Sequence, residues 1–236
     1  MKNLASSLNS TLERFTGLRV QPAADTRLSR YRSYLLDKHK IETVIDVGAN
    51  QGQFGSRLRR SGYRGFISSF EPSPAFESLK QVVKHDNKWQ ISNVALGKAK
   101  GPVEMNLASN GNLSSSLKRP TGILNEFPLE FQSGHKINME RLDDVVTLTK
   151  EAYLKIDVQG FEFEVLEGAT KTMSHLIAVE FEAALTPLYE GEHTFVELDT
   201  YLREYGFIAA MIAPTHWSKT GELLSLDSIY IREDAK

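Results

Sequence analysis

The segment Asp46-Val-Gly-Ala-Asn-Gln-Gly52 joins an apolar, β-branched run to a helical pattern through a glycine-containing turn. Glycine at positions 48 and 52 lets the main chain turn sharply and lets a ligand approach the backbone closely. The N–H groups at the start of the following helix point into that gap, where they favour a carboxylate or a phosphate. This stretch therefore predicts a small-molecule site at the end of a strand.

Two acidic residues near this turn indicate the class of ligand. Glu71 ends the next apolar run, at a position where an acidic residue holds ribose hydroxyls in nucleotide-binding α/β folds. The dinucleotide pattern G-x-G-x-x-G needs glycine where Asn50 stands, because the backbone must come close to a pyrophosphate there. The pattern argues against NAD, so a nicotinamide oxidoreductase is a distant alternative. Asp46 suits a ligand with a cationic end, such as S-adenosylmethionine.

The elements that must position these residues follow an α/β pattern. Short β-branched runs alternate with helical patterns, which predicts an open, Rossmann-like α/β sheet of seven strands with the last two antiparallel. The polar–apolar alternation at 102–107 and 136–140 predicts an inserted β-ribbon. The seven principal strands are expected at 43–47, 65–70, 89–94, 152–157, 176–181, 207–212 and 226–231.

The residues before the first strand predict two helices, one over 3–15 and one from Asp25 to about His39. We expect 1–40 to be an N-terminal helical extension and 41–236 to be the ligand-binding domain. The first helix suits a terminal cap or a contact in a homo-oligomer, and the alternative is a weak anchor at a membrane surface.

The composition excludes several kinds of protein. The chain has 236 residues, of which 41% are hydrophobic and 25% charged, and a net charge of −2 without a basic stripe. Nucleic acid is therefore not an expected partner. The absence of cysteine excludes disulfides and thiolate chemistry, and it is compatible with the cytoplasm, where we expect the protein. No apolar run reaches the ~20 residues of a transmembrane helix, and the six histidines show no metal-site spacing.

Several motifs in combination resemble the FkbM-type S-adenosylmethionine-dependent methyltransferases. They are Asp46-Val-Gly-Ala-Asn-Gln-Gly, Phe70-Glu-Pro-Ser-Pro, Asn93-Val-Ala-Leu-Gly, Ser114-Ser-Ser-Leu, Arg141-Leu-Asp and Lys155-Ile-Asp-Val-Gln-Gly-Phe-Glu-Phe-Glu-Val-Leu-Glu-Gly-Ala. The resemblance covers about 41–232 and implies the seven-stranded methyltransferase sheet and, mostly, O-methylation of hydroxyls on sugars or secondary metabolites. Gln159 departs from the family, which more often has an acidic residue there.

The resemblance also implies a set of cofactor contacts. The methionine part would lie on Gly48, Asn50 and Gly52. Glu71 would take the ribose hydroxyls, and Asn93 would lie by the adenine. The full set of cofactor-binding candidates is Asp46, Gly48, Asn50, Gly52, Phe54, Glu71, Pro72, Asn93, Ser114, Ser115 and Asp157.

Methylation of a hydroxyl needs a group that takes the proton as the new bond forms. Asp157, at the end of a central strand, is the first candidate for this base, and Glu180 and His135 are the alternatives. Either carboxylate could instead hold Mg²⁺, although no specific metal motif is present. Asp157 could also be a helix cap, and a lone histidine is more often structural. Lys155, in the same strand, is expected to face an acid.

The small, polar residues from 108 to 122 predict a lid in which Ser114 and Ser115 close over the cofactor or contact the acceptor. A plain surface loop is the alternative. The sequence as a whole predicts an S-adenosylmethionine-dependent O-methyltransferase of a small molecule or glycan. The alternative is a catalytically silent protein of the same fold that binds a nucleoside or serves in assembly. The acceptor is not selected by the sequence, because fold does not fix substrate.

Overall fold

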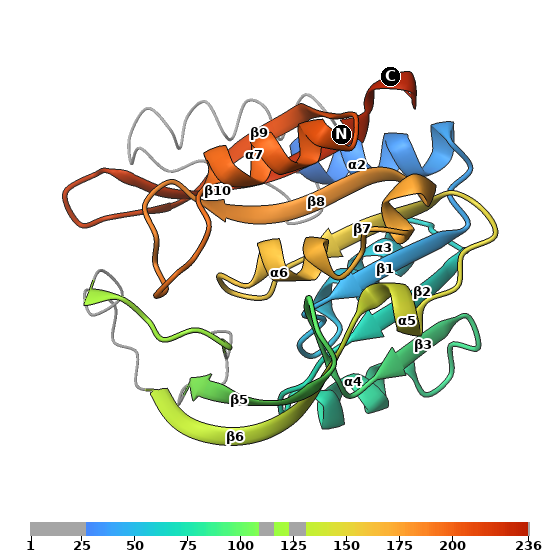
Figure 1. Ribbon diagram of the computed structural model, residues 1–236. Coiled ribbons are helices and arrows are strands. Elements are labelled where there is room, and N and C mark those ends of the chain that lie inside the picture. Colours follow the sequence, from blue (N-terminus) through green and yellow to red (C-terminus); the bar gives the residue numbers. More distant parts are fainter. Residues whose placement is uncertain (1–26, 109–115, 123–130, 236) are drawn as a thin grey trace, which may run out of the picture.

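The computed structural model describes residues 27–108, 116–122 and 131–235 (Figure 1). The helix expected over 3–15 and the two serines Ser114 and Ser115 lie outside these ranges. Within them, no helix combines the length and the apolar character that a bilayer-spanning segment requires.

A seven-stranded sheet forms the centre of the molecule, with the strand order β3-β2-β1-β7-β8-β10-β9. The first five strands in that order run parallel, and β10 is antiparallel to both β8 and β9. The predicted fold class is therefore confirmed. The strands are β1 Thr43–Val47, β2 Phe66–Phe70, β3 Trp89–Ser92, β7 Ala152–Ile156, β8 Leu176–Ala184, β9 Phe207–Trp217 and β10 Leu223–Arg232.

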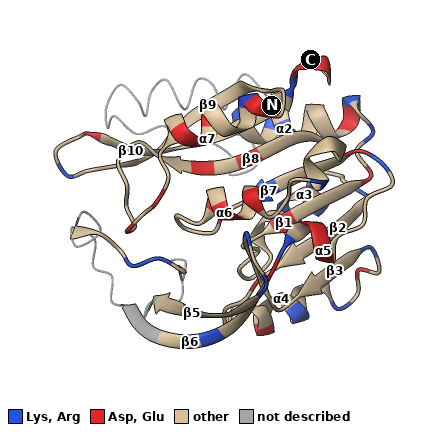
Figure 2. Cartoon of the chain, viewed as in Figure 1, with Lys and Arg blue, Asp and Glu red and all other residues tan. Residues whose placement is uncertain are grey.

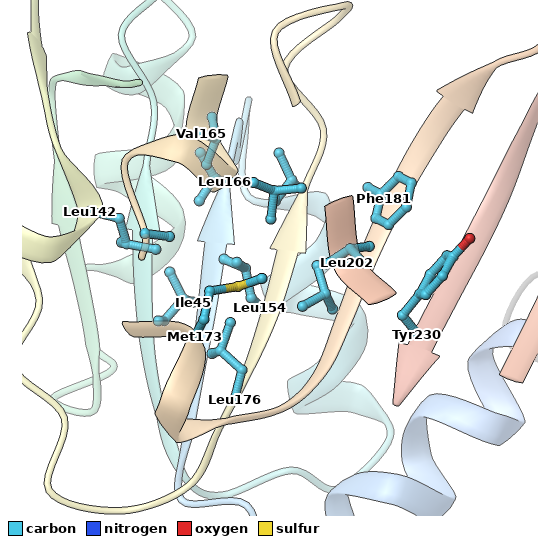
Figure 3. Close-up of a cluster of buried hydrophobic side chains, with 14 of the residues drawn as sticks. Ile45, Leu142, Leu154, Val165, Leu166, Met173, Leu176, Phe181, Leu202 and Tyr230 are labelled. Atoms are coloured by element: carbon cyan, nitrogen blue, oxygen red, sulfur yellow. The ribbon is translucent and has the colours of Figure 1, made fainter. Parts of the chain in front are cut away.

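Helices cover both faces of the sheet, and each face has its own apolar cluster. On one face α2, α3 and α4 bury residues such as Leu35, Leu58 and Leu79. On the other face α5, α6 and α7 do so, and Figure 3 shows Leu166 and Leu202 within this second cluster. The helices are α2 Arg27–Lys38, α3 Gln53–Arg60, α4 Phe76–Val83, α5 Leu142–Val145, α6 Glu162–Glu167 and α7 Phe195–Glu204, with short 3₁₀ turns at Thr172–His175 and Glu233–Ala235.

The predicted β-ribbon is present as a second, three-stranded sheet. The strand β5, Gly101–Ala108, pairs antiparallel with β6, Phe131–Glu140, which also pairs with the short strand β4, Ala95–Leu96. In Figure 1 this sheet curves away below the main sheet. Lys and Arg are interspersed with Asp and Glu over the elements in Figure 2.

Helix α2 packs in the same core as the sheet, although the sequence assigned it to an extension that ends at residue 40. Leu28, Leu35 and Leu36 join the first apolar cluster, and the Arg32 side chain is buried beneath them. The strand β8 continues to Ala184, beyond its expected end at residue 181. As a result Glu180 lies inside a strand rather than at its end.

Candidate functional site

A cavity of about 550 Å³ lies at the carboxyl ends of β1, β2 and β7. This is the edge of the sheet where the strand order reverses, which is where open α/β sheets bind ligands. Its volume is typical of small-molecule pockets. Among the residues singled out from the sequence, its wall contains Asp46, Gly48, Asn50, Phe54, Glu71, Pro72 and Asp157.

The turn after β1 is fixed by its contact with the end of β7. Gly48 has a φ of +81°, and a Cβ atom there would lie 1.9 Å from the carbonyl oxygen of Asp157. No residue with a side chain fits that position without moving one of the two segments. Gly52, which precedes α3, instead faces Leu79, whose Cδ1 would be 2.8 Å from an added Cβ. Gly52 is not part of the cavity wall, so its observed role is to pack the turn against α4.

Glu71 is buried at the end of β2, and backbone N–H groups hold its carboxylate. The N–H groups of Asn50 and Ser73 each donate to one of its oxygens at 2.7 Å. A carboxylate oxygen accepts two hydrogen bonds, so each can still accept one from a ligand hydroxyl. Asn93 is exposed and outside the cavity wall, and its Nδ2 donates to the Glu71 carbonyl oxygen at 2.8 Å. Its assignment to the adenine stays a prediction.

Asn50 carries an unsatisfied acceptor in the cavity wall. Its side-chain Oδ1 is buried and has no hydrogen-bond partner among the residues that the structure describes. A buried acceptor without a partner costs about 1–3 kcal/mol. A ligand with a donor group would remove this cost, and the role of Asn50 in cofactor binding stays a prediction.

Asp46 is buried beside Asn50, and its carboxyl group accepts a hydrogen bond from the Ser69 hydroxyl at 3.1 Å. Burial raises the pKa of Asp46 to about 7, against the opposing effects of the Ser69 hydrogen bond and the Lys155 charge. Near neutral pH this group therefore holds a proton part of the time. A cation beside it would favour the ionised form.

Asp157 and Lys155 bring the end of β7 into the cavity wall, next to Asp46 on β1. Lys155 Nζ lies 3.6 Å from Asp157 Oδ2, which identifies the acid that Lys155 was expected to face. Burial alone would lower the pKa of Lys155, but the charges of Asp157 and Glu180 outweigh it and hold that pKa above its ordinary value. Lys155 therefore carries a positive charge beside the Asp157 carboxylate.

Glu180 is committed to a buried ion pair and is not available as a base. Its two carboxylate oxygens accept hydrogen bonds of 2.6 Å from Arg32, and the Tyr153 hydroxyl donates to one of them. Burial acts to raise the pKa of Glu180, but the Arg32 charge outweighs it, so this pKa lies below its ordinary value. Glu180 is also absent from the cavity wall. Its assignment as a catalytic base is therefore corrected to a structural role.

His135 lies on β6 opposite Met105, where it is exposed and outside the cavity wall. The structure does not place His135 beside Asp157, the candidate base in the cavity wall. The described residues also contain no group of three or more His, Asp or Glu side chains that could hold a metal ion. The Mg²⁺ site considered from the sequence gains no support.

Several wall residues were not found from the sequence. Arg57 on α3 lines the cavity, and its side chain makes no hydrogen bond or ion pair with another described residue. Met105 and Leu107 reach the wall from β5. The helical pattern predicts only that Arg57 lies on the polar face of α3. No local signal predicts whether that face points toward the cavity.

The described end of the expected lid is anchored. The backbones of Asn106 and Ser116 exchange two hydrogen bonds, and Lys118 forms an ion pair with Glu164 at 2.8 Å. Leu117, between these anchors, lines the cavity. This stretch is thus a fixed part of the cavity wall, while the roles of Ser114 and Ser115 stay predictions outside the described residues.

Comparison with known proteins gives three further findings. The family model "Methyltransferase FkbM domain" matches residues 46–209. The chain is 26% identical over 204 residues to the 2-O-methyltransferase NoeI of Sinorhizobium fredii, covering 81% of this chain and 83% of that protein. It is 25% identical over 188 residues to Methyltransferase 1 of Beauveria bassiana, covering 72% and 74%.

Among solved structures, the chain is similar in fold to an FkbM methyltransferase from Methylobacillus flagellatus KT. The TM-score is 0.50 at 15% identity, and the match covers 80% of this chain. This chain spans 43% of that protein's length, so the likeness concerns the fold of one part of it.

Proposed function

The chain belongs to the methyltransferase FkbM family, and from this premise we propose that it transfers the methyl group of S-adenosylmethionine to a hydroxyl oxygen of a sugar, glycan or secondary metabolite. The observation that carries the proposal is the cavity wall itself, which combines the Glu71 carboxylate, the unsatisfied Asn50 Oδ1 and the Asp157 carboxylate. The name of the relative NoeI, a 2-O-methyltransferase, favours oxygen as the methyl acceptor.

The residues of the wall fit this cofactor. Asn50 Oδ1 and the Asp46 carboxyl group would accept hydrogen bonds from its ammonium group. Glu71 would accept from the ribose hydroxyls. Arg57 would pair with the methionine carboxylate, since its guanidinium lines the same cavity.

The bound cofactor supplies a methyl carbon on a positively charged sulfonium, which is already activated for transfer. The protein's part is to align the acceptor oxygen and to take its proton. Asp157 lines the same cavity as Glu71, and its side chain is 42% exposed, so an acceptor hydroxyl can reach it. Asp157 would accept the hydroxyl proton while an oxygen electron pair forms the new bond to the methyl carbon; the carbon–sulfur bond would break, and its electron pair would leave on the sulfur of S-adenosylhomocysteine.

The proposal is tested in two steps. Calorimetry with S-adenosylhomocysteine measures cofactor binding, and methyl-tritiated S-adenosylmethionine with a panel of monosaccharides and oligosaccharides measures transfer. We expect one binding site and label in at least one hydroxylated acceptor. Binding without transfer to any acceptor would support the catalytically silent alternative. A thermal shift with NAD and none with S-adenosylhomocysteine would support the oxidoreductase.

A further inference from the structure

The Asp157 carboxylate is held on its protein side by two groups. Its Oδ1 accepts a hydrogen bond of 2.9 Å from Gln159 Nε2, and its Oδ2 faces Lys155 Nζ. The Lys155 side chain is only 9% exposed, whereas that of Asp157 is 42% exposed. The carboxylate is therefore oriented by these two groups on one side, and its other side is accessible.

Gln159 is itself oriented by Tyr189. The Tyr189 hydroxyl donates to Gln159 Oε1 at 2.9 Å. An amide has an acceptor at one end and a donor at the other, so accepting from Tyr189 turns its NH₂ group toward Asp157. Burial raises the pKa of Tyr189, and the nearby Glu162 and Glu192 act in the same direction. The Tyr189 hydroxyl thus stays protonated and remains a donor.

The backbone conformation at Gln159 and Gly160 holds this turn against Tyr189. Gln159 has a φ of +56°, in the left-handed region, and Gly160 follows with a φ of +86°. A Cβ atom on Gly160 would lie 2.7 Å from Cδ2 of the Tyr189 ring. The turn after β7 is therefore packed directly on the buried ring, so a shift of one would move the other.

The segment around Tyr189 has anchors of its own. The Glu192 carboxylate accepts hydrogen bonds from the backbone N–H groups of Leu188 and Tyr189. The Leu188 carbonyl accepts from Thr121 N–H at 2.8 Å. These bonds connect Tyr189 to the anchored stretch that places Leu117 in the cavity wall.

We propose that Gln159 and Tyr189 are positioning residues that aim the Asp157 carboxylate at the acceptor hydroxyl. The inference rests on the proposed function, because it takes Asp157 as the group that receives the hydroxyl proton. Tyr189 fixes the amide of Gln159, the amide fixes one oxygen of Asp157, and the Lys155 ammonium group lies against the other oxygen.

The same arrangement gives a reason for an amide at position 159, where the family resemblance more often implies an acid. An amide donates to Asp157 without adding charge. A carboxylate there would place two like charges in contact, and the pair would then hold a shared proton to higher pH.

The first test compares Tyr189→Phe with the control Tyr201→Phe. The control removes a hydroxyl on α7 that, among the described residues, hydrogen-bonds only to Tyr205 Oη, at 3.4 Å. We expect Tyr189→Phe to lower kcat for the acceptor found in the saccharide panel by about tenfold or more, because the amide loses its fixed orientation. The KM for S-adenosylmethionine should stay within about twofold. Equal kcat values in the two variants would overturn the inference.

The second test needs no acceptor. The side-chain carboxyl ¹³C resonance of Asp157, identified by its loss in Asp157→Asn, is titrated in the complex with S-adenosylhomocysteine. We expect its midpoint to rise by about one pH unit in Gln159→Glu, because the added carboxylate opposes ionisation. An unchanged midpoint would show that residue 159 does not act on Asp157.

Asp157→Asn separates this inference from the proposed function. If it lowers transfer about 100-fold or more with S-adenosylhomocysteine affinity intact, Asp157 is the base, and unchanged Tyr189 and Gln159 variants would then count against the positioning role alone. If Asp157→Asn transfers methyl at the unmodified rate, the proposed base is wrong and the positioning role falls with it.

Discussion

At the scale of single residues, the site is a set of polar atoms whose bonding capacity is only partly used. Glu71 has one hydrogen bond at each oxygen, and Asn50 Oδ1 has none within the described part of the chain. Asp157 is held from one side only. Polar groups in a protein core normally have their hydrogen bonds satisfied. Polar groups with unsatisfied hydrogen-bonding capacity in a cavity wall are therefore expected of a binding site.

Glu71→Ala should weaken S-adenosylhomocysteine binding by about 10- to 100-fold, because hydrogen bonds to a charged group contribute about 1.5–3 kcal/mol each. Calorimetry measures the affinity, and circular dichroism checks the fold. Glu77→Ala is the matched control, since Glu77 lies on α4 in an exposed ion pair with Lys80. Unchanged affinity in Glu71→Ala would rule out the ribose assignment.

Asp46 should make cofactor binding depend on pH. Its pKa of about 7 means that a cationic ligand must displace a proton when it binds below that pH. Affinity for S-adenosylmethionine should therefore fall by up to about tenfold per pH unit below pH 7. Calorimetry between pH 5.5 and 7.5, in buffers of different ionisation enthalpy, measures both the affinity and the released proton.

The control for this prediction is Asp46→Asn, which should remove both the pH dependence and the proton release. A slope that persists in the variant would assign the effect to another group. The same pKa has a consequence for the ligand-free protein. Between about pH 4 and pH 7 the folded state keeps a proton that the unfolded state has lost, so Asp46 lowers stability as pH rises through that window.

At the scale of elements, the important contact joins α2 to β8 across the sheet face. Arg32 and Glu180 are both almost fully buried and bonded through two hydrogen bonds. The Arg32 guanidinium also lies over the Phe54 ring, with its carbon 4.8 Å from the ring centroid, and Phe54 lines the cavity. Helix α2 thus supports the cavity wall through the contact of Arg32 with Phe54.

Arg32→Ala should lower the free energy of unfolding by about 3–5 kcal/mol, because it leaves Glu180 as a buried charge without its partner. Urea denaturation measures this change. Arg203→Ala is the matched control, since its ion pair with Asp199 is on the exposed side of α7 and should contribute little to the free energy of unfolding. Similar losses in both variants would mean that the buried pair does not support the fold.

At the scale of the whole molecule, the sequence predicted what depends on local pattern. The seven strands, the ribbon and the glycine turn have signals within a few residues, and all lie near their expected ranges. The role of Glu180 could not be predicted this way, because its partner Arg32 is 148 positions away in the chain. The residues after Glu180, Phe-Glu-Ala-Ala, also contain no local signal that β8 would continue to Ala184.

The candidate site could likewise be predicted only where its residues have local sequence signals. Asp46 lies near the end of a strand that the sequence located, and Glu71 and Asp157 directly follow two others, so their meeting at one edge follows from the parallel sheet. Arg57, Met105 and Leu117 reach the same cavity from a helix face, the ribbon and an anchored loop. Their directions depend on packing between distant segments, which no local pattern contains.

The requirement for glycine at position 48 also limits which sequence changes a protein of this kind can accept. The turn that would hold the methyl donor and the strand end that carries Asp157 touch at this position, with no room for a single methyl group. A substitution there would move the turn after β1 and the segment of Asp157 apart, so we expect it to change donor affinity and turnover together. New acceptor preferences must arise from changes elsewhere, and the parts of the wall contributed by β5 and by the stretch at Leu117 can vary without disturbing that contact.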